Sequence, residues 1–91
     1  MEVTIDEDIT LVLEGRVLEL FWRGRTPSGK SRWHVDHVGV DAKQTGDGGF
    51  EVKIGDRDGD DIFGAVRFSV SPEASEGFQE FFEAAKAARS G

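Results

Sequence analysis

The residues best suited to binding chemistry are cations gathered in one short stretch of the chain. Four of the eleven basic residues lie between Trp22 and Trp33, in the sequence WRGRTPSGKSRW: Arg23, Arg25, Lys30 and Arg32. Guanidinium groups bind phosphate and carboxylate through paired hydrogen bonds, and an exposed tryptophan adds a stacking surface. The pattern indicates a site for an anion or an acidic peptide. Because charged clusters are commonly solvated faces, the alternative is a polar loop with both tryptophans in the core.

A second cluster, of acidic residues at Asp56–Asp61 (DRDGDD), has the composition of a calcium-binding loop. Ca²⁺ is held by several carboxylate oxygens, and a loop of the EF-hand kind needs glycine at its sixth position and glutamate at its twelfth. Counted from Asp56, those positions hold Asp61 and Arg67. The spacing therefore favours a polar hairpin connection over a cation site.

A third cluster, at His34, Asp36 and His37, contains residue types that bind transition metals. In a strand, His34 and Asp36 point to one face, and His37 falls at a predicted corner. No third and fourth ligand follow nearby, so we predict surface or hydrogen-bonded histidines and no metal site.

Nucleophilic catalysis finds no support in the sequence. The hydroxyl residues Thr26, Ser28, Ser31 and Ser69 have no neighbouring base and orienting acid that would activate them. We therefore predict no catalytic residue, no cofactor and a protein that is not an enzyme.

Composition points to one small domain, residues 1–91, with no disulfide because the chain has no cysteine. The net charge of -7, from 18 acidic and 11 basic residues, opposes binding to nucleic acid or to an anionic membrane surface. No apolar run approaches the ~20 residues of a spanning helix, and the first residues, MEVTIDED, do not resemble a signal or transit peptide. We expect a cytoplasmic protein.

The elements that must position these residues follow from the apolar pattern. Alternation of apolar and polar residues predicts seven short strands, at 2–5, 9–14, 17–23, 31–35, 38–43, 50–54 and 65–70. The stretch Gly55–Asp61 between the last two is predicted to be a loop, because it is rich in glycine and aspartate.

A change of period after Val70 predicts a C-terminal helix over 72–89. Ser71-Pro72-Glu73 supplies an N-cap hydroxyl, a proline at the first helical position and an acid near the positive end of the helix dipole. Gly77 weakens the first turns, and the alternative is a regular helix that begins only at Ser75. One face carries an apolar stripe that we expect to be buried: Phe78, Phe81, Phe82 and Ala85.

Seven strands followed by one helix resemble the pleckstrin-homology-like (PH-like) superfamily, in particular its small bacterial domains of unknown function. The resemblance covers nearly the whole chain and includes the corner Arg32–Val40 and the last strand Val66–Val70 leading into the helix. It implies two bent antiparallel sheets that form a partly open seven-stranded barrel, capped by the helix. It also implies a binding or scaffold module. Lipid-binding members use basic residues in the first two strands, whereas Val3–Gly15 contains no lysine or arginine here.

Three functional hypotheses follow. The first is a non-enzymatic interaction or scaffold module that binds a protein partner at a sheet edge or beside the helix. The second is an anion or phospho-ligand binding domain that uses the basic loop 23–32. The third is homo-oligomerisation through an exposed strand edge, which sedimentation over a range of concentrations would detect.

Overall fold

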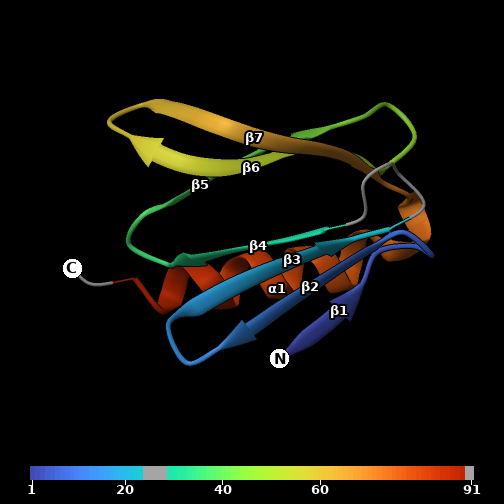
Figure 1. Ribbon diagram of the computed structural model, residues 1–91. Coiled ribbons are helices and arrows are strands. Elements are labelled where there is room, and N and C mark those ends of the chain that lie inside the picture. Colours follow the sequence, from blue (N-terminus) through green and yellow to red (C-terminus); the bar gives the residue numbers. More distant parts are fainter. Residues whose placement is uncertain (24–28, 90–91) are drawn as a thin grey trace.

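Two antiparallel sheets and a C-terminal helix make up the protein (Figure 1), whose computed structural model describes residues 1–23 and 29–89. Sheet A has the strand order β1 (Glu2–Thr4), β2 (Ile9–Glu14), β3 (Val17–Trp22) and β4 (Gly29–His34). Sheet B has the order β5 (Val38–Gln44), β6 (Phe50–Asp58) and β7 (Asp61–Val70). A short 3-10 turn, η1 (Pro72–Ala74), leads into the helix α1 (Ser75–Ala87). The predicted fold class, two open antiparallel sheets capped by a helix, is confirmed.

The core lies between the inner faces of the two sheets and α1. Alternation along β2 and β3 places Ile9, Leu11 and Leu13 on the same face as Leu18 and Leu20, and all five are buried. Sheet B contributes inward-facing side chains of its own strands to the same cluster: Val38, Val52, Ile54, Phe68 and Val70. The period-two pattern of the sequence therefore arises because each sheet buries only one of its faces.

The helix begins as the sequence predicts and covers the core with part of its apolar stripe. The Ser71 hydroxyl accepts a hydrogen bond from the amide of Ala74 (3.3 Å), and the regular helix starts at Ser75. Phe78 and Phe81 are buried, as is Ala85 one turn later. Phe82, which was predicted to share that burial, is only half-buried, because it lies at the side of the stripe, with Lys86 Nζ 5.0 Å from its ring centroid.

The predicted loop Gly55–Asp61 is wrong in its extent. β6 continues to Asp58 and β7 begins at Asp61, so that only Gly59 and Asp60 form the turn of a long hairpin. Gly59 has φ +61°, which suits the first central position of a two-residue hairpin turn. Cross-strand pairing of Arg57 with Ile62 extends the ladder through residues whose local preference is for loops.

The turn between β5 and β6 contains a carboxyl group, that of Asp47, whose pKa is shifted by its hydrogen bonds. The hydroxyl of Thr45 donates to Asp47 Oδ1, and the amide of Gly49 donates to the same oxygen (3.1 Å). The Thr45 hydroxyl first, and then this amide, lower the pKa of Asp47 below its ordinary value of 3.8.

Asp47 is accordingly expected to make stability depend on pH in the acid range. A carboxyl whose folded-state pKa is depressed stabilises the fold above its unfolded pKa, and that stabilisation is lost as the pH falls through the folded value. Urea unfolding at neutral pH and at a pH below 3.8 should show a smaller acid-induced loss of stability in Asp47→Asn than in the parent chain. Equal losses in the two proteins would contradict this role.

Candidate functional site

Three of the predicted site residues lie together on the outer face of sheet A. Alternation along β3 places Arg23, just beyond Trp22, on the face opposite to the core, and the β3–β4 register places Lys30 and Arg32 on that same face. All three side chains belong to exposed residues. Arg25, the fourth predicted cation, lies outside the described residues.

The two tryptophans lie on the inner side of the sheet. Trp33 is buried, and its indole Nε1 donates to Asp56 Oδ1 at 2.9 Å. Trp22 is half-buried, and its ring lies so close over Gly29 that a Cβ at that position would be 2.7 Å from the indole Cζ2. Trp33 therefore belongs to the core, as the alternative interpretation of the basic stretch expected, whereas Trp22 packs against the core and is only partly buried.

The outer face of sheet A combines apolar side chains with the three cations. Val12, Val17 and Phe21 are half-buried there. Lys30 Nζ lies 6.0 Å from the centroid of the Phe21 ring, within range of a cation–π interaction. We call this set the outer-sheet surface: Val12, Val17, Phe21, Arg23, Lys30 and Arg32.

A buried carboxylate lies within this surface. Glu19 is only 8% exposed although it is on the outer face, and Arg32 Nη2 lies 3.5 Å from its Oε1. The side chain of Arg32 is itself 68% exposed, so its guanidinium keeps donors directed at solvent. Arg32 can therefore offset Glu19 and still contact an anionic group from outside.

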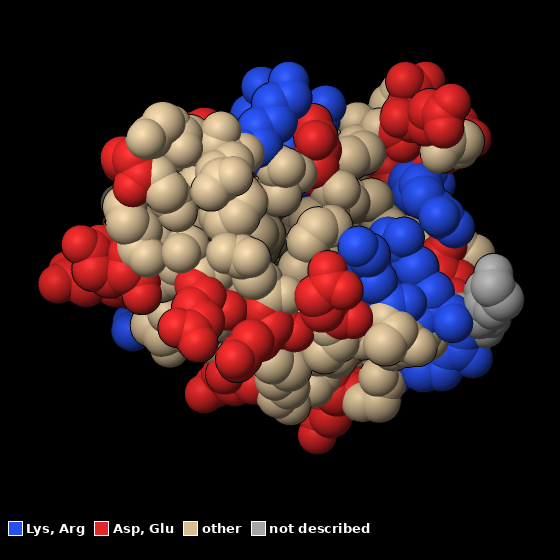
Figure 2. Space-filling view, turned by 180° about the vertical axis from the view of Figure 1, so that it is seen from behind, with Lys and Arg blue, Asp and Glu red and all other residues tan. Residues whose placement is uncertain are grey.

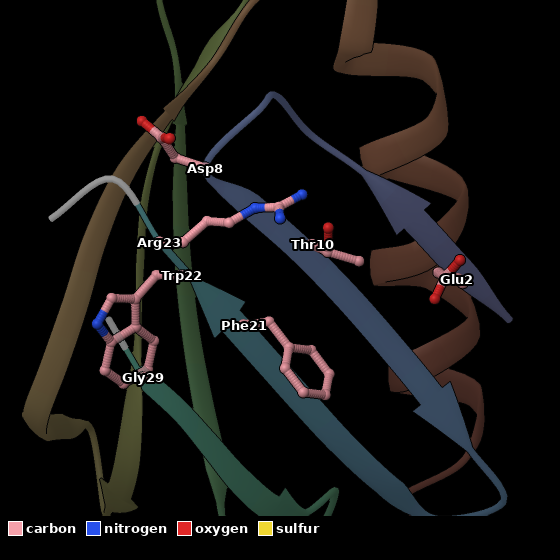
Figure 3. A pocket seen from close by; sticks show the side chains of 7 residues that line it. All are labelled: Glu2, Asp8, Thr10, Phe21, Trp22, Arg23 and Gly29. Atoms are coloured by element: carbon pink, nitrogen blue, oxygen red, sulfur yellow. The ribbon is translucent and has the colours of Figure 1, made fainter. Parts of the chain in front are cut away.

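A hollow of about 590 Å³ adjoins Phe21 (Figure 3). Arg23 extends along it, and its Nε donates to the carbonyl of Glu7 at 3.2 Å. The hollow is lined by residues from all four strands of sheet A and their connections: Glu2, Asp8, Thr10, Phe21, Trp22, Arg23 and Gly29. Sequence analysis missed Phe21 and Thr10; the alternation of β2 and β3 places each on the outer face, but only the register makes them neighbours.

A different group of charges surrounds the corner between β4 and β5. Arg16 Nη2 lies 3.3 Å from Asp36 Oδ1, Arg57 Nη2 donates to the Asp36 carbonyl (2.8 Å), and Arg89 Nη2 donates to the carbonyl of Val38 (3.1 Å). Figure 2, the view from behind, shows basic side chains gathered on its right, the side on which α1 ends. These hydrogen bonds tie the helix end and the β6–β7 hairpin to the corner. The sequence gives no local signal for them, because the partners are far apart in the chain.

The metal-site candidates are not assembled into ligand sets. The rings of His34 and His37 are 5.8 Å apart, and His34 Nδ1 accepts a hydrogen bond from the amide of Asp36 (3.1 Å). Within residues 1–23 and 29–89, no three side chains of histidine, aspartate or glutamate are grouped so that they could hold a metal ion. Asp56, from the acidic cluster, is instead the acceptor for Trp33.

The helices in the described part of the chain are too short or too polar to cross a membrane. Comparison of the sequence with protein-family models and with curated proteins, and of the fold with solved structures, gives no significant match.

Proposed function

We propose that the protein is a non-enzymatic interaction module whose outer-sheet surface binds a protein partner through an acidic segment with an apolar anchor. One observation carries this proposal. α1 and sheet B both pack on the inner face of sheet A, so none of the described elements covers the outer face, which nevertheless carries Val12, Val17 and Phe21 beside cations (Figure 1). Apolar side chains next to arginine are typical of the centre of protein interfaces.

The apolar part of the surface supplies affinity. Removing apolar area from water is worth about 25 cal/mol per Å², and Phe21 adds a ring that a partner side chain can cover from one side. The adjoining hollow offers space for such an anchor. Aromatic and arginine side chains dominate binding energy where a partner desolvates them together, and a partner that covers Phe21 beside Lys30, Arg23 and the hollow would do so.

The cations supply selectivity for an acidic partner despite the net charge of -7. At physiological ionic strength, charges separated by more than about 8 Å in solvent are largely screened, so the local sign of the surface decides which segment can dock. Here that local sign comes from Lys30, Arg32 and Arg23. The PH-like layout that the sequence resembles is used more often for binding than for catalysis, which supports the same conclusion.

Selection from a displayed random-peptide library against the folded domain tests the proposal. We expect recovery of peptides that combine aspartate or glutamate with a large apolar residue. Their binding, measured by fluorescence anisotropy, should weaken about tenfold or more in Phe21→Ala and in Lys30→Glu. Phe63→Ala and Lys43→Glu are the matched controls, because they make the same changes at exposed positions of sheet B and should leave affinity nearly unchanged.

Three outcomes would overturn the proposal. The selection could enrich no peptide, or the control variants could lose as much peptide affinity as Phe21→Ala and Lys30→Glu. The parent chain could also form a concentration-dependent dimer that Lys30→Glu dissociates. The last would identify a second copy as the occupant.

A second candidate function is favoured by the placement of Arg23, Lys30 and Arg32 on one face, which suits a phosphorylated ligand. Such a site would bind inorganic phosphate itself and would not depend on Phe21.

A further inference from the structure

The hydrogen-bond phase of the β3–β4 ladder fixes which backbone groups of β4 point away from the sheet. The amide of Val35, just beyond β4, donates to the carbonyl of Arg16 at 2.8 Å, in the same register as the ladder. In an antiparallel pair, residues alternate between bonding their partner and pointing outward. Trp33 and Ser31 therefore bond to β3, whereas the N–H and C=O groups of Lys30 and Arg32 point to the free edge.

This edge is regular and has no strand paired with it among residues 1–23 and 29–89. β4 is the last strand of sheet A, and its six pairs with β3 run without a register shift. Among the described residues, no backbone–backbone hydrogen bond links Lys30 or Arg32 to any element beyond β4.

The other three edges of the two sheets are short, partly occupied or irregular. β1 has only three residues. On β5, the carbonyl of Val38 already accepts a hydrogen bond from Arg89. On β7, a register shift lies opposite Gly64, whose φ is +60°, and such a bulge disfavours pairing with a further strand. The edge formed by β4 is therefore the one best suited to pair with an additional strand.

The side chains of the same two residues define the strand that fits. Lys30 and Arg32 carry the outward backbone groups and are also the cations of β4, whose sequence GKSRWH contains no acid. Charged edge residues repel strands of like charge and, by the same physics, admit strands of opposite charge. A residue paired with Lys30 or Arg32 would have its side chain on the outer face beside them, while its neighbours in the added strand would face the inner side.

We propose that β4 accepts an extended segment of the partner as an antiparallel fifth strand of sheet A, with aspartate or glutamate opposite Lys30 and Arg32 and apolar residues at the alternate positions. This inference rests on the proposed function and gives the binding mode of the acidic segment. Because the apolar residues of this strand face the inner side, the anchor that covers Phe21 on the outer face is a separate part of the partner. Main-chain hydrogen bonds then supply affinity and the alternating side chains supply specificity.

A short blocked peptide of alternating glutamate and valine tests the inference, with a lysine–valine peptide as its charge control. Two further versions of the glutamate peptide carry N-methyl groups on alternate backbone amides, one version in each phase. We expect the glutamate peptide to bind at least about tenfold more tightly than the lysine peptide. N-methylation should weaken binding about tenfold or more in one phase only, because only one set of amides faces β4.

Amide hydrogen exchange followed by NMR supplies the second readout. Binding should slow exchange at the amides of Lys30 and Arg32, whereas the amides of Ser31 and Trp33, already bonded to β3, should change little. If the peptide binds but both methylated versions behave alike and exchange at Lys30 and Arg32 is unchanged, strand addition is overturned and the proposed function stands. A glutamate peptide that does not bind also overturns strand addition, and failure of the library selection separately overturns the proposed function.

Discussion

Replacing Phe78 by alanine is expected to lower the free energy of unfolding by about 3–5 kcal/mol. Phe78 is 1% exposed and packs against two other rings, with centroid distances of 5.4 Å to Phe50 and 6.0 Å to Phe82. It therefore joins α1 to the first residue of β6. Truncation removes the transfer free energy of the ring and leaves a cavity that surrounding strands cannot readily fill, because they are held by their own ladders.

Urea unfolding measured by tryptophan fluorescence gives the required free energies. Phe63→Ala is the matched control: the same atoms are removed from a residue that is 54% exposed, so its effect should stay within about 0.5 kcal/mol. Phe82→Ala should fall between the two, since Phe82 is half-buried. Because a domain of this kind has a stability of about 5–15 kcal/mol, the Phe78 variant should still fold. Similar losses at Phe78 and Phe63 would show that the helix does not close the core as described.

The strands and the helix start could be predicted from the sequence because their signals are local. Alternation such as Ile9, Leu11, Leu13 arises wherever a strand has one buried face, and Ser71 followed by Pro72 is a helix start on chemical grounds. The length of the β6–β7 hairpin is underestimated by the sequence pattern for the opposite reason: its signals are not local. Gly55 and Asp58 prefer loops locally, and only pairing with neighbouring strands keeps them in β6: Gly55 pairs with Gly39 of β5 and Asp58 with Asp61 of β7.

The candidate site was predictable only in part, for a related reason. Alternation along each strand is enough to place Arg23 on one face of β3, and Lys30 with Arg32 on one face of β4. That these two faces coincide, and that Phe21 lies between Thr10 and Lys30, depends on the registers of β2–β3 and β3–β4. Register is set by side chains on both strands and by the connecting turns, so one strand read alone does not contain it.

Gly55→Ala is the other substitution expected to destabilise the fold strongly, by about 1–3 kcal/mol. Gly55 is buried where the β6–β7 register shifts. A Cβ there would overlap the carbonyl oxygen of Phe63 and would lie 2.9 Å from Ile62 Cγ2 and 3.0 Å from the Cα of Ala65. Two of these three atoms are backbone, so relief requires the bulged part of β7 to move.

Gly46→Ala separates this steric effect from the general consequence of replacing glycine. Neither Gly46 nor Gly55 has a positive φ, so the added methyl group strains neither backbone directly. A Cβ at Gly46 would have no neighbour within 4 Å, and alanine there should leave the free energy of unfolding unchanged or raise it slightly, by up to about 1 kcal/mol, through reduced freedom of the unfolded chain. Thermal unfolding of both variants compares their stabilities, and Gly55→Ala should be the less stable of the two. A Gly55→Ala protein as stable as Gly46→Ala would mean that β7 does not press against β6 at the bulge, and the obstruction that leaves β4 as the better edge for a partner strand would lose its structural basis.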